Sequence, residues 1–187
     1  MKKHTLGFLK KQIQCIMKLS KPIAIMILTL LSSCKTTSHL NAVKEVDIEK
    51  YQGLWYEIAK YPNRFQRNCL SSTATYSIHE KGYLIVENRC KKKSPEGKNG
   101  YIKGKAFPVK NSNNSKLKVQ FFWPFKANYW IIDLDPNYQW AVVSEPKRNY
   151  LWILARYPKM DENTYQTILH KLKENGFAIE KIEKTSH

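Results

Sequence analysis

Histidine and cysteine, the side chains that most often bind metals or act as nucleophiles, are few and scattered in this chain of 187 residues. No two of the histidines have the short spacing with which neighbouring ligands hold one metal ion. The chain also lacks the Gly-x-Ser-x-Gly motif of a serine nucleophile and the glycine-rich loop that binds phosphate. We therefore expect no catalytic residue, no metal site and no cofactor, and we predict a protein that is not an enzyme. The histidines beyond the first residues of the chain are His39, His79, His170 and His187.

Cys34 stands at the end of a segment with the features of an export signal. The first 21 residues contain six lysines and no acid, and residues 23–31 form an apolar run of nine. A basic segment, a short apolar run and small residues before a break are typical of a secretory signal peptide, which we predict at residues 1–33. A buried N-terminal helix is the alternative, but the run lacks the polar residues that would recur about every 3.6 positions. If Met17 is the true start, residues 1–16 lie upstream of it.

The segment LSSC at residues 31–34 resembles the bacterial lipobox, a sequence that is cleaved before a cysteine. That cysteine then receives a diacylglyceryl group and an N-linked acyl chain such as palmitate. Burial contributes about 0.8 kcal/mol per methylene, so two or three acyl chains form a lasting membrane anchor. We predict lipid attachment at Cys34 and a tether at residues 34–45. Because Lys35 rather than Asp follows the cysteine, we expect sorting to the outer membrane if the host is Gram-negative. We place the anchored protein on the periplasmic face of that membrane.

The chain is strongly basic, with 32 Lys and Arg residues against 15 Asp and Glu and a net charge of +17. Removing residues 1–33 removes six lysines and no acid, which leaves 26 basic and 15 acidic residues and a net charge of +11. The remaining lysines are scattered, without an arginine-rich groove or a known nucleic-acid motif. We expect no nucleic-acid partner, and we assign the charge to a solvated surface or to contact with anionic membrane headgroups.

Short strands dominate the rest of the chain. Apolar residues alternate with polar ones in segments that are bounded by turn-forming Gly, Pro, Asn and Asp. Eight strands at short, even spacing with no intervening helix argue for an antiparallel barrel or sandwich. The predicted strands are residues 54–60, 72–78, 83–87, 101–107, 116–121, 128–134, 139–143 and 150–156.

The apolar period changes after Pro158 to that of an amphipathic helix. Asp161 can cap this helix and Gly176 can end it, and we predict a short last strand at residues 177–179. An all-β, eight-stranded barrel with one C-terminal helix packed on its wall has an interior that can hold one small ligand. The apolar face of the helix carries Tyr165, Ile168, Leu169 and Leu172.

Three segments resemble the sequence motifs of the lipocalin family and occur in the family's order. Residues 53–58 (GLWYEI) are similar to the first motif, G-x-W, near the start of the domain. Residues 133–138 (DLDPNY) resemble the second motif, between the sixth and seventh strands, although the commoner form there is Thr-Asp-Tyr. Residues 151–156 (LWILAR) resemble the third, which supplies an arginine. The resemblance covers about residues 46–183.

Three segments look particularly like the bacterial branch of that family, whose members are outer-membrane lipoproteins. Residues 55–59 (WYEIA), 73–77 (TATYS) and 150–154 (YLWIL) carry this likeness, and the lipobox agrees with it. The resemblance implies a lipocalin domain at residues 46–187, folded as an antiparallel up-and-down barrel that encloses a ligand calyx.

The lipocalin resemblance also implies structural roles for three motif residues. In the family, the tryptophan fills the closed end of the barrel and the arginine lies across it, roles that fall here to Trp55 and Arg156. Gly53 is the glycine of the same motif. A desolvated cation–π contact of this kind contributes roughly 1–2 kcal/mol. We assign these residues to the structure and not to ligand contact.

Cys69 and Cys90 lie just outside the hairpin predicted over residues 72–87. In an exported protein two such thiols are expected to oxidise to a disulfide. If Tyr83 pairs with His79 across the hairpin turn, the regular ladder does not place Cys69 opposite Cys90. The bridge therefore requires a bulge or a loop before Ser71. The alternative is Cys69 as a nucleophile, as in the lipocalin branch that isomerises prostaglandins, but no histidine or carboxylate at a telling spacing supports it.

The ligand-binding residues are predicted from the alternation of each strand. If Trp55 points into the barrel, alternation along its strand turns Glu57 and Ala59 inward as well. In the strand predicted at residues 128–134, we take Tyr129 rather than Trp130 as the inward residue, although the pattern favours it only slightly. Each apolar residue taken alone is also explained by core packing, but together they describe an elongated apolar cavity with a few polar groups, suited to an acyl chain. The calyx candidates are Glu57, Ala74, Tyr76, Ile78, Leu84, Val86, Leu117, Val119, Phe121, Tyr129, Ile131, Trp152 and Leu154.

These features together predict a membrane-anchored lipid-binding protein. The bacterial lipocalins imply that it stores or transports fatty acids or (lyso)phospholipids at the outer membrane and supports membrane maintenance, with a homodimer left open. Basic Arg64, Arg67 and Lys126 at the open end are candidates to meet a carboxylate or phosphate, or are solvated loop charges. A lipid-modifying enzyme and a protein-interaction module that docks through residues 123–125 remain alternatives.

Overall fold

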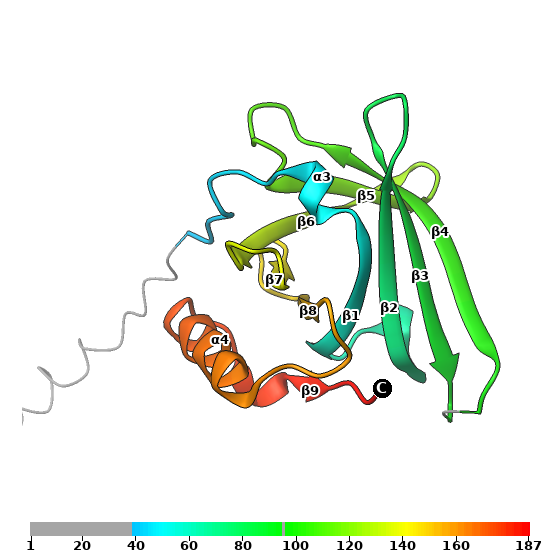
Figure 1. Cartoon of the computed structure of the whole chain (residues 1–187), viewed down its shortest axis with the longest axis vertical. Coiled ribbons are helices and arrows are strands. Elements are labelled where there is room, and N and C mark those ends of the chain that lie inside the picture. The colour runs from blue at the N-terminus through cyan, green and yellow to red at the C-terminus, as the bar shows by residue number, and fades with distance from the viewer. Residues whose placement is uncertain (1–38, 95) are drawn as a thin grey trace, which may run out of the picture. The chain divides into compact units, whose positions relative to one another are not determined.

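Eight antiparallel strands follow one another along the chain and close into a barrel (Figure 1). The computed structural model describes residues 39–94 and 96–187. Each strand pairs with the next, and β1 pairs with both β8 and β2, which closes the sheet and confirms the predicted barrel. The strands are β1 (Gly53–Lys60), β2 (Cys69–Ile78), β3 (Leu84–Lys92), β4 (Asn99–Pro108), β5 (Lys116–Phe122), β6 (Phe125–Leu134), β7 (Trp140–Ser144) and β8 (Leu151–Ala155).

The two ends of the barrel differ in the segments that cover them. Because successive strands run up and down, the β2–β3, β4–β5 and β6–β7 turns lie at one end and the other four connections lie at the opposite end. The helix α3 (Ile48–Tyr51) precedes β1 at the first end, where buried Tyr51 packs on Trp55. We call this the closed end and the opposite one the mouth end.

The helix α4 (Glu162–Glu174) covers one outer wall of the barrel, as predicted (Figure 1). Asp161 caps it by accepting a hydrogen bond from the Thr164 backbone N–H at 2.9 Å. Gly176 ends the helix with a φ of +78°, a conformation that glycine adopts at little cost. The buried face carries Tyr165, Ile168 and Leu172, which form a second core with the outer side of β1, β7 and β8.

A bulge in β1 reverses the expected direction of one residue. The register between β1 and β8 shifts between Glu57 and Ala59, so the alternation that starts at Trp55 does not continue past the bulge. The prediction that Ala59 points into the barrel is therefore wrong. Ala59 and Ile58 both belong to the core beneath α4.

The last residues add a ninth strand in a place that differs from the prediction. Residues 177–179 are not a strand, because the Phe177 N–H bonds the Leu172 carbonyl at the end of α4 and its side chain seals the helix–barrel core. A 3-10 turn, η3 (Ile179–Lys181), follows, and β9 (Glu183–Lys184) then pairs with Ala59 and Lys60 of β1.

The predicted disulfide between Cys69 and Cys90 is present and joins β2 to β3. The required bulge is present too, as the register of β2 and β3 shifts between Leu70 and Thr73. Ser71 within this bulge has a φ of 49°. The bulge lets the two cysteines meet although Cys69 is paired with Lys92 in the ladder.

The predicted signal peptide, residues 1–33, and the predicted lipid attachment at Cys34 lie outside the described residues. The predicted lipocalin domain, residues 46–187, falls in one compact unit that runs from Ser38 to His187. Among the residues that the structure describes, no helix is both long and apolar enough to span a bilayer.

Candidate functional site: an apolar calyx

The inner faces of the strands form one apolar group within the barrel, which we call the calyx wall. Alternation turns every second side chain of a strand inward, so that Leu117 and Val119 of β5 are buried while Lys118 between them is not. Some members of the wall, Phe121 and Trp152 among them, remain partly accessible. The buried members are Val46, Tyr51, Trp55, Tyr76, Leu84, Val86, Ala106, Leu117, Val119, Ile131, Ala141, Val143 and Leu154.

Most of the predicted calyx residues belong to this wall. Eleven of the thirteen candidates are in it, and Tyr129 rather than Trp130 faces inward. Trp130 lies outside, with the Lys116 ammonium 4.1 Å from the centre of its ring. Ile78 differs from the prediction, since it ends β2 at the closed end and is 37% exposed. Contact of these residues with a ligand stays a prediction.

The prediction missed some members of the wall. Ala141 and Val143 alternate within a predicted strand, so their inward direction was available from the sequence. Tyr51 was not, because it lies on the four-residue helix α3, which is too short to show an apolar period. Its position follows from the Asp47 cap, whose side chain accepts hydrogen bonds from the Glu49 and Lys50 N–H groups.

Three tyrosine hydroxyls meet inside the barrel next to Trp55. The Tyr129 oxygen is 2.8 Å from that of Tyr51 and 2.8 Å from that of Tyr76. Burial raises the pKa of Tyr51 and Tyr129 well above the usual range and that of Tyr76 to about 12. The group is therefore neutral at physiological pH, and it provides hydroxyl groups without charge at the base of an apolar wall.

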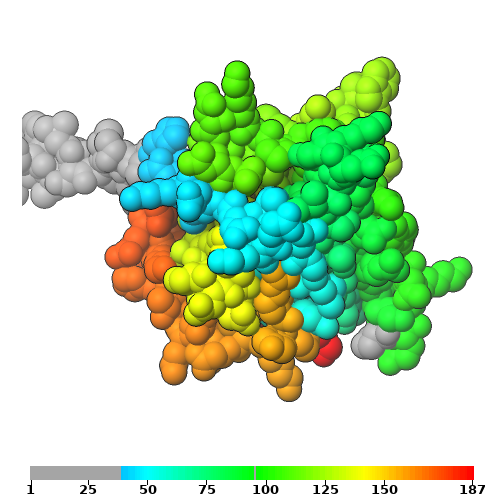
Figure 2. Space-filling view, turned by 45° about the horizontal axis from the view of Figure 1, so that its top comes forward, coloured from blue at the N-terminus to red at the C-terminus, as the bar shows by residue number. Residues whose placement is uncertain are grey.

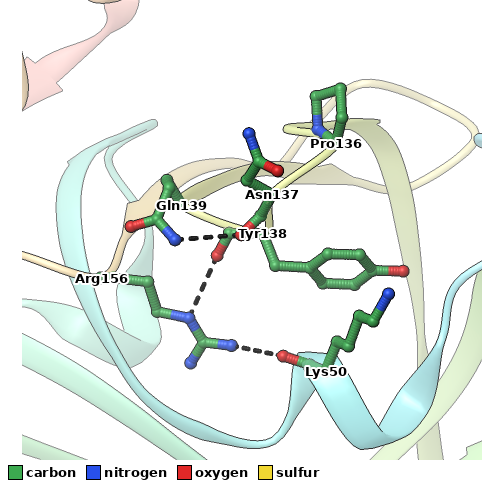
Figure 3. Close-up of a pocket in the computed structure, with 6 residues that line it drawn as sticks. All are labelled: Lys50, Pro136, Asn137, Tyr138, Gln139 and Arg156. Carbon is green, nitrogen blue, oxygen red and sulfur yellow. Dashed lines mark hydrogen bonds between the residues drawn. The ribbon is translucent and has the colours of Figure 1, made fainter.

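Arg156 lies across Trp55 at the closed end, in the arrangement that the motifs predict. Its guanidinium carbon is 3.8 Å from the centre of the indole ring, and Nη1 and Nη2 donate to the Leu54 and Lys50 carbonyls at 3.0 and 2.6 Å. Nε donates to the Tyr138 carbonyl at 3.1 Å (Figure 3). Partial burial lowers the pKa of Arg156, but it stays a cation at any pH near neutral.

Gly53 is required beside this arginine for a steric reason. Its φ of +91° is unfavourable for other residues, and a Cβ there would stand 3.4 Å from Nη1 of Arg156. Since all three kinds of guanidinium nitrogen are committed to backbone carbonyls, Arg156 joins α3, β1 and the β6–β7 turn. Its role is structural, and the surface pocket of about 410 Å³ beside it is lined by Lys50, residues 136–139 and Arg156 itself (Figure 3).

Glu57 lies towards the mouth end in a buried polar network. Only 3% of it is exposed, and its Oε1 atom is 2.7 Å from Nζ of Lys60 and accepts a hydrogen bond from Thr185 Oγ1 at 2.8 Å. Gln66 donates to Oε2 and accepts from the indole N–H of Trp152 at 2.8 Å. A buried charge with this many partners is stabilised in place. Both carboxylate oxygens of Glu57 are thus occupied by contacts with Lys60, Gln66 and Thr185, which join parts of the barrel wall, and neither is free to contact a ligand.

Two buried polar atoms near the calyx have no hydrogen-bond partner in the described part of the protein: Ser72 Oγ and Asn88 Oδ1. Asn88 pairs with Ala74 across β2 and β3, so the two side chains share a face, and Ala74 packs on the calyx wall. Unsatisfied buried polar groups are rare and costly. Asn88 therefore offers an inward-facing group that a polar ligand atom would satisfy.

Two further features of the described residues do not compete with the calyx as a binding site. A groove of about 210 Å³ between α4 and the barrel is lined by Leu40, Ile168 and Leu172 together with polar neighbours. Within residues 39–94 and 96–187, no three His, Cys, Asp or Glu side chains gather as metal ligands would. Arg64 and Arg67, the predicted anion contacts, are exposed in the β1–β2 connection.

A closed up-and-down barrel with an apolar interior, one helix on its wall and an arginine-covered tryptophan at one end defines a class of proteins that enclose small hydrophobic molecules. Residues 46–187 match the family described as the lipocalin-like domain. The chain therefore belongs to the lipocalin family, whose members generally bind or transport such molecules and are not enzymes.

Sequence relatives come from bacteria, plants and mammals. The chain is 38% identical over 144 residues to the outer membrane lipoprotein Blc of Escherichia coli, which covers 76% of this chain and 80% of Blc. It is 39% identical over 155 residues to temperature-induced lipocalin-1 of Arabidopsis thaliana, covering 78% and 82%. To mouse apolipoprotein D it is 38% identical over 150 residues, covering 74% and 76%. The chain is thus a Blc-like lipocalin.

Solved structures support the fold. Insecticyanin from the tobacco hornworm Manduca sexta superposes with a TM-score of 0.65 at 18% identity, covering 80% of this chain and 85% of insecticyanin. Lobster apocrustacyanin A1 gives a TM-score of 0.60 at 16% identity, covering 74% and 78%. At these identities the likeness concerns the barrel architecture alone.

Proposed function

We propose that this lipocalin binds fatty acids or (lyso)phospholipids and stores or transports them at the bacterial outer membrane, in support of membrane maintenance. The observation that carries the proposal is the calyx wall, whose inward side chains are apolar yet include the partly accessible Phe121, Tyr129 and Trp152. Binding an acyl chain of about fifteen methylenes would gain near 12 kcal/mol from burial, against roughly 4–15 kcal/mol for association. Micromolar or weaker binding follows from this balance.

The outer-membrane location rests on the lipobox at residues 31–34 and on the relatives named outer membrane lipoprotein Blc. We propose that the chain is anchored there through acylated Cys34. The polar atoms of a ligand headgroup would be met by the tyrosine hydroxyls of the closed end or by Asn88, the inward amide without a partner.

Native mass spectrometry of residues 35–187, followed by lipid extraction, tests the binding. We expect a fatty acid or lysophospholipid to co-purify at near-stoichiometric occupancy. The Ala74→Phe variant fills part of the calyx and should lower occupancy severalfold, whereas Ser77→Phe, at an exposed position of the same strand, should not. An empty barrel that also takes up no added lipid would contradict the proposal and favour a protein-interaction module.

A further inference from the structure

The tip of the β5–β6 hairpin presents a group of aromatic side chains to solvent. Phe122 is 68% exposed, Trp123 86% and Phe125 77%. The tip stands out from the barrel as a projection, yellow-green in Figure 2. Large aromatic residues that cluster at one exposed point mark a contact with a protein or a membrane.

Lysines predominate on the strands that carry this tip. Residues 97–132, which include β4, β5 and β6 as far as Ile132, contain seven lysines and no Asp, Glu or Arg, and the one acid on these strands is Asp133 at the far end of β6 from the tip. On these strands the inward positions are apolar, so the lysines project from the outer surface: Lys103 and Lys105 on β4, Lys116 and Lys118 on β5, and Lys126 on β6. Together with the aromatic tip these five lysines form what we call the docking surface.

Of the five lysines of the docking surface, Lys103 alone forms an ion pair within the described residues. Glu87 on the adjacent strand β3 is the nearest acid by register, and it already accepts a hydrogen bond from Tyr101 at 2.6 Å and lies 3.5 Å from Lys103. Lys126 and Lys105 lie over aromatic rings, 4.3 Å from the centre of Phe107 and 5.0 Å from that of Tyr83. These contacts hold the lysine stems along the outer wall and leave the charges uncompensated.

A second connection at the mouth end has the same character. Phe65 in the β1–β2 connection is 69% exposed, and the Arg64 guanidinium lies 5.0 Å from the centre of its ring. Because the β1–β2 and β5–β6 connections belong to the same end of an up-and-down barrel, the aromatic and basic side chains recur around the mouth and not at one loop alone.

We propose that the docking surface binds an anionic phospholipid bilayer, with Trp123 and its neighbours inserted among the headgroups and the lysines lying on them. Tryptophan favours the bilayer interface, and each lysine near an anionic surface strengthens binding. An acidic protein would satisfy the lysines but would not require a protruding aromatic point. This proposal rests on the proposed function in one respect: docking would bring the mouth of the calyx to the membrane, which is a source of lipid.

Quenching of tryptophan fluorescence by brominated acyl chains tests the insertion. The full-length chain carries Cys34→Ser so that no acyl chain is attached, and it is mixed with vesicles of phosphatidylglycerol and phosphatidylcholine. We expect strong quenching that is mostly lost in Trp123→Phe, because the other tryptophans of the described residues lie in the barrel or on its wall away from the tip. Equal quenching in the Cys34→Ser chain and in its Trp123→Phe variant would overturn the proposal. This holds even if another segment binds both proteins to the vesicle, because the fluorescence change reports on Trp123 itself.

Three further variants in the same background separate the forces. Lys105→Gln combined with Lys118→Gln and Lys126→Gln should weaken binding at least roughly tenfold at low salt, as should Trp123→Ala with Phe125→Ala. Tyr157→Ala removes a 69% exposed aromatic residue beyond β8, at the closed end, and should leave affinity within about twofold.

Equal affinity for pure phosphatidylcholine vesicles, or binding to polyglutamate but to no vesicle, would overturn the proposal, the latter in favour of an acidic protein. Lipid occupancy of the calyx, measured on the variant that combines Trp123→Ala with Phe125→Ala, should be unchanged. Conversely, Ala74→Phe should still dock. The two proposals can thus fail separately.

Discussion

The three tyrosines at the base of the calyx are buried and uncharged, and hydrogen bonds between their hydroxyl groups join them. Tyr129 bridges Tyr51 and Tyr76 through hydroxyl contacts of 2.8 Å, and none of the three reaches solvent sufficiently to ionise easily. Any one of them that loses its proton would place a negative charge in an apolar interior, next to two hydroxyl dipoles. The stability of the closed end should therefore depend on pH in the alkaline range.

We expect Tyr76 to destabilise the fold between about pH 10 and 12. Its folded pKa is about 12, whereas an unfolded tyrosine has a pKa of about 10. Below the unfolded value both states hold the proton and nothing is lost. As the pH rises through this window the unfolded chain releases the proton first, so the free energy of unfolding falls by roughly 3 kcal/mol. Urea unfolding at about pH 8, 10 and 11.5 measures this fall.

The Tyr76→Phe variant isolates the contribution of one hydroxyl from the other groups that titrate at high pH. Its free energy of unfolding should decline less steeply than that of the parent chain over the same window. Tyr157→Phe is the matched control, because Tyr157 is 69% exposed and should leave the slope unchanged. Parallel slopes for the parent and Tyr76→Phe would show that burial of Tyr76 does not govern the alkaline transition.

At the scale of elements, the disulfide between β2 and β3 secures the hairpin that forms one side of the calyx. It joins residues 21 positions apart, and the ladder on its closed-end side is interrupted by the bulge before Thr73. A cross-link over a loop of this length stabilises the fold by about 3 kcal/mol, chiefly by restricting the unfolded chain.

Replacing both cysteines by serine should therefore lower the free energy of unfolding by about 3 kcal/mol and leave the fold intact. Urea denaturation of the parent with and without a reducing agent, beside the double variant, measures the effect. Reduction should make the parent resemble the double variant and should not change the variant further. A reduced parent as stable as the oxidised one would contradict the prediction.

The sequence predicted the elements whose pattern is local. Alternation in each strand depends on neighbours one and two positions away, so eight strands, α4 and eleven of the thirteen calyx candidates were found without knowledge of the fold. The bulge at Glu57 was not found, because it depends on how β1 meets β8 and β9. The predicted strand at residues 177–179 was wrong for the same reason. The apolar residues there pack at the end of α4, and pairing with β1 begins only at Glu183.

At the scale of the whole molecule, the last residues complete the barrel at the mouth end. β1 pairs with β2 only through residues 53–56, and beyond them the two strands separate. Residues 183–187 lie between β1 and β2 where these strands separate. The Thr185 N–H donates to the Ile58 carbonyl of β1 at 2.9 Å, and the Ser186 carbonyl accepts from the Ser71 N–H of β2 at 3.1 Å. The Thr185 hydroxyl also reaches Glu57. This segment thus links the two strands at the place where the calyx opens.

Deleting residues 183–187 should open this seam without unfolding the barrel. The strands would lose at least five hydrogen bonds, each contributing roughly 0.5–1.5 kcal/mol, so we expect the free energy of unfolding to fall by roughly 2.5–7.5 kcal/mol. Hydrogen exchange should rise first at the Ser71 amide, whose acceptor is removed, while amides at the closed end, such as Trp55, stay protected. Deleting His187 alone removes its contact with the Glu57 carbonyl and the edge-to-face packing of its ring on Tyr56, and should cost about 2 kcal/mol. A truncated chain that keeps both the parent stability and slow exchange at Ser71 would show that β1 and β2 close the mouth by themselves.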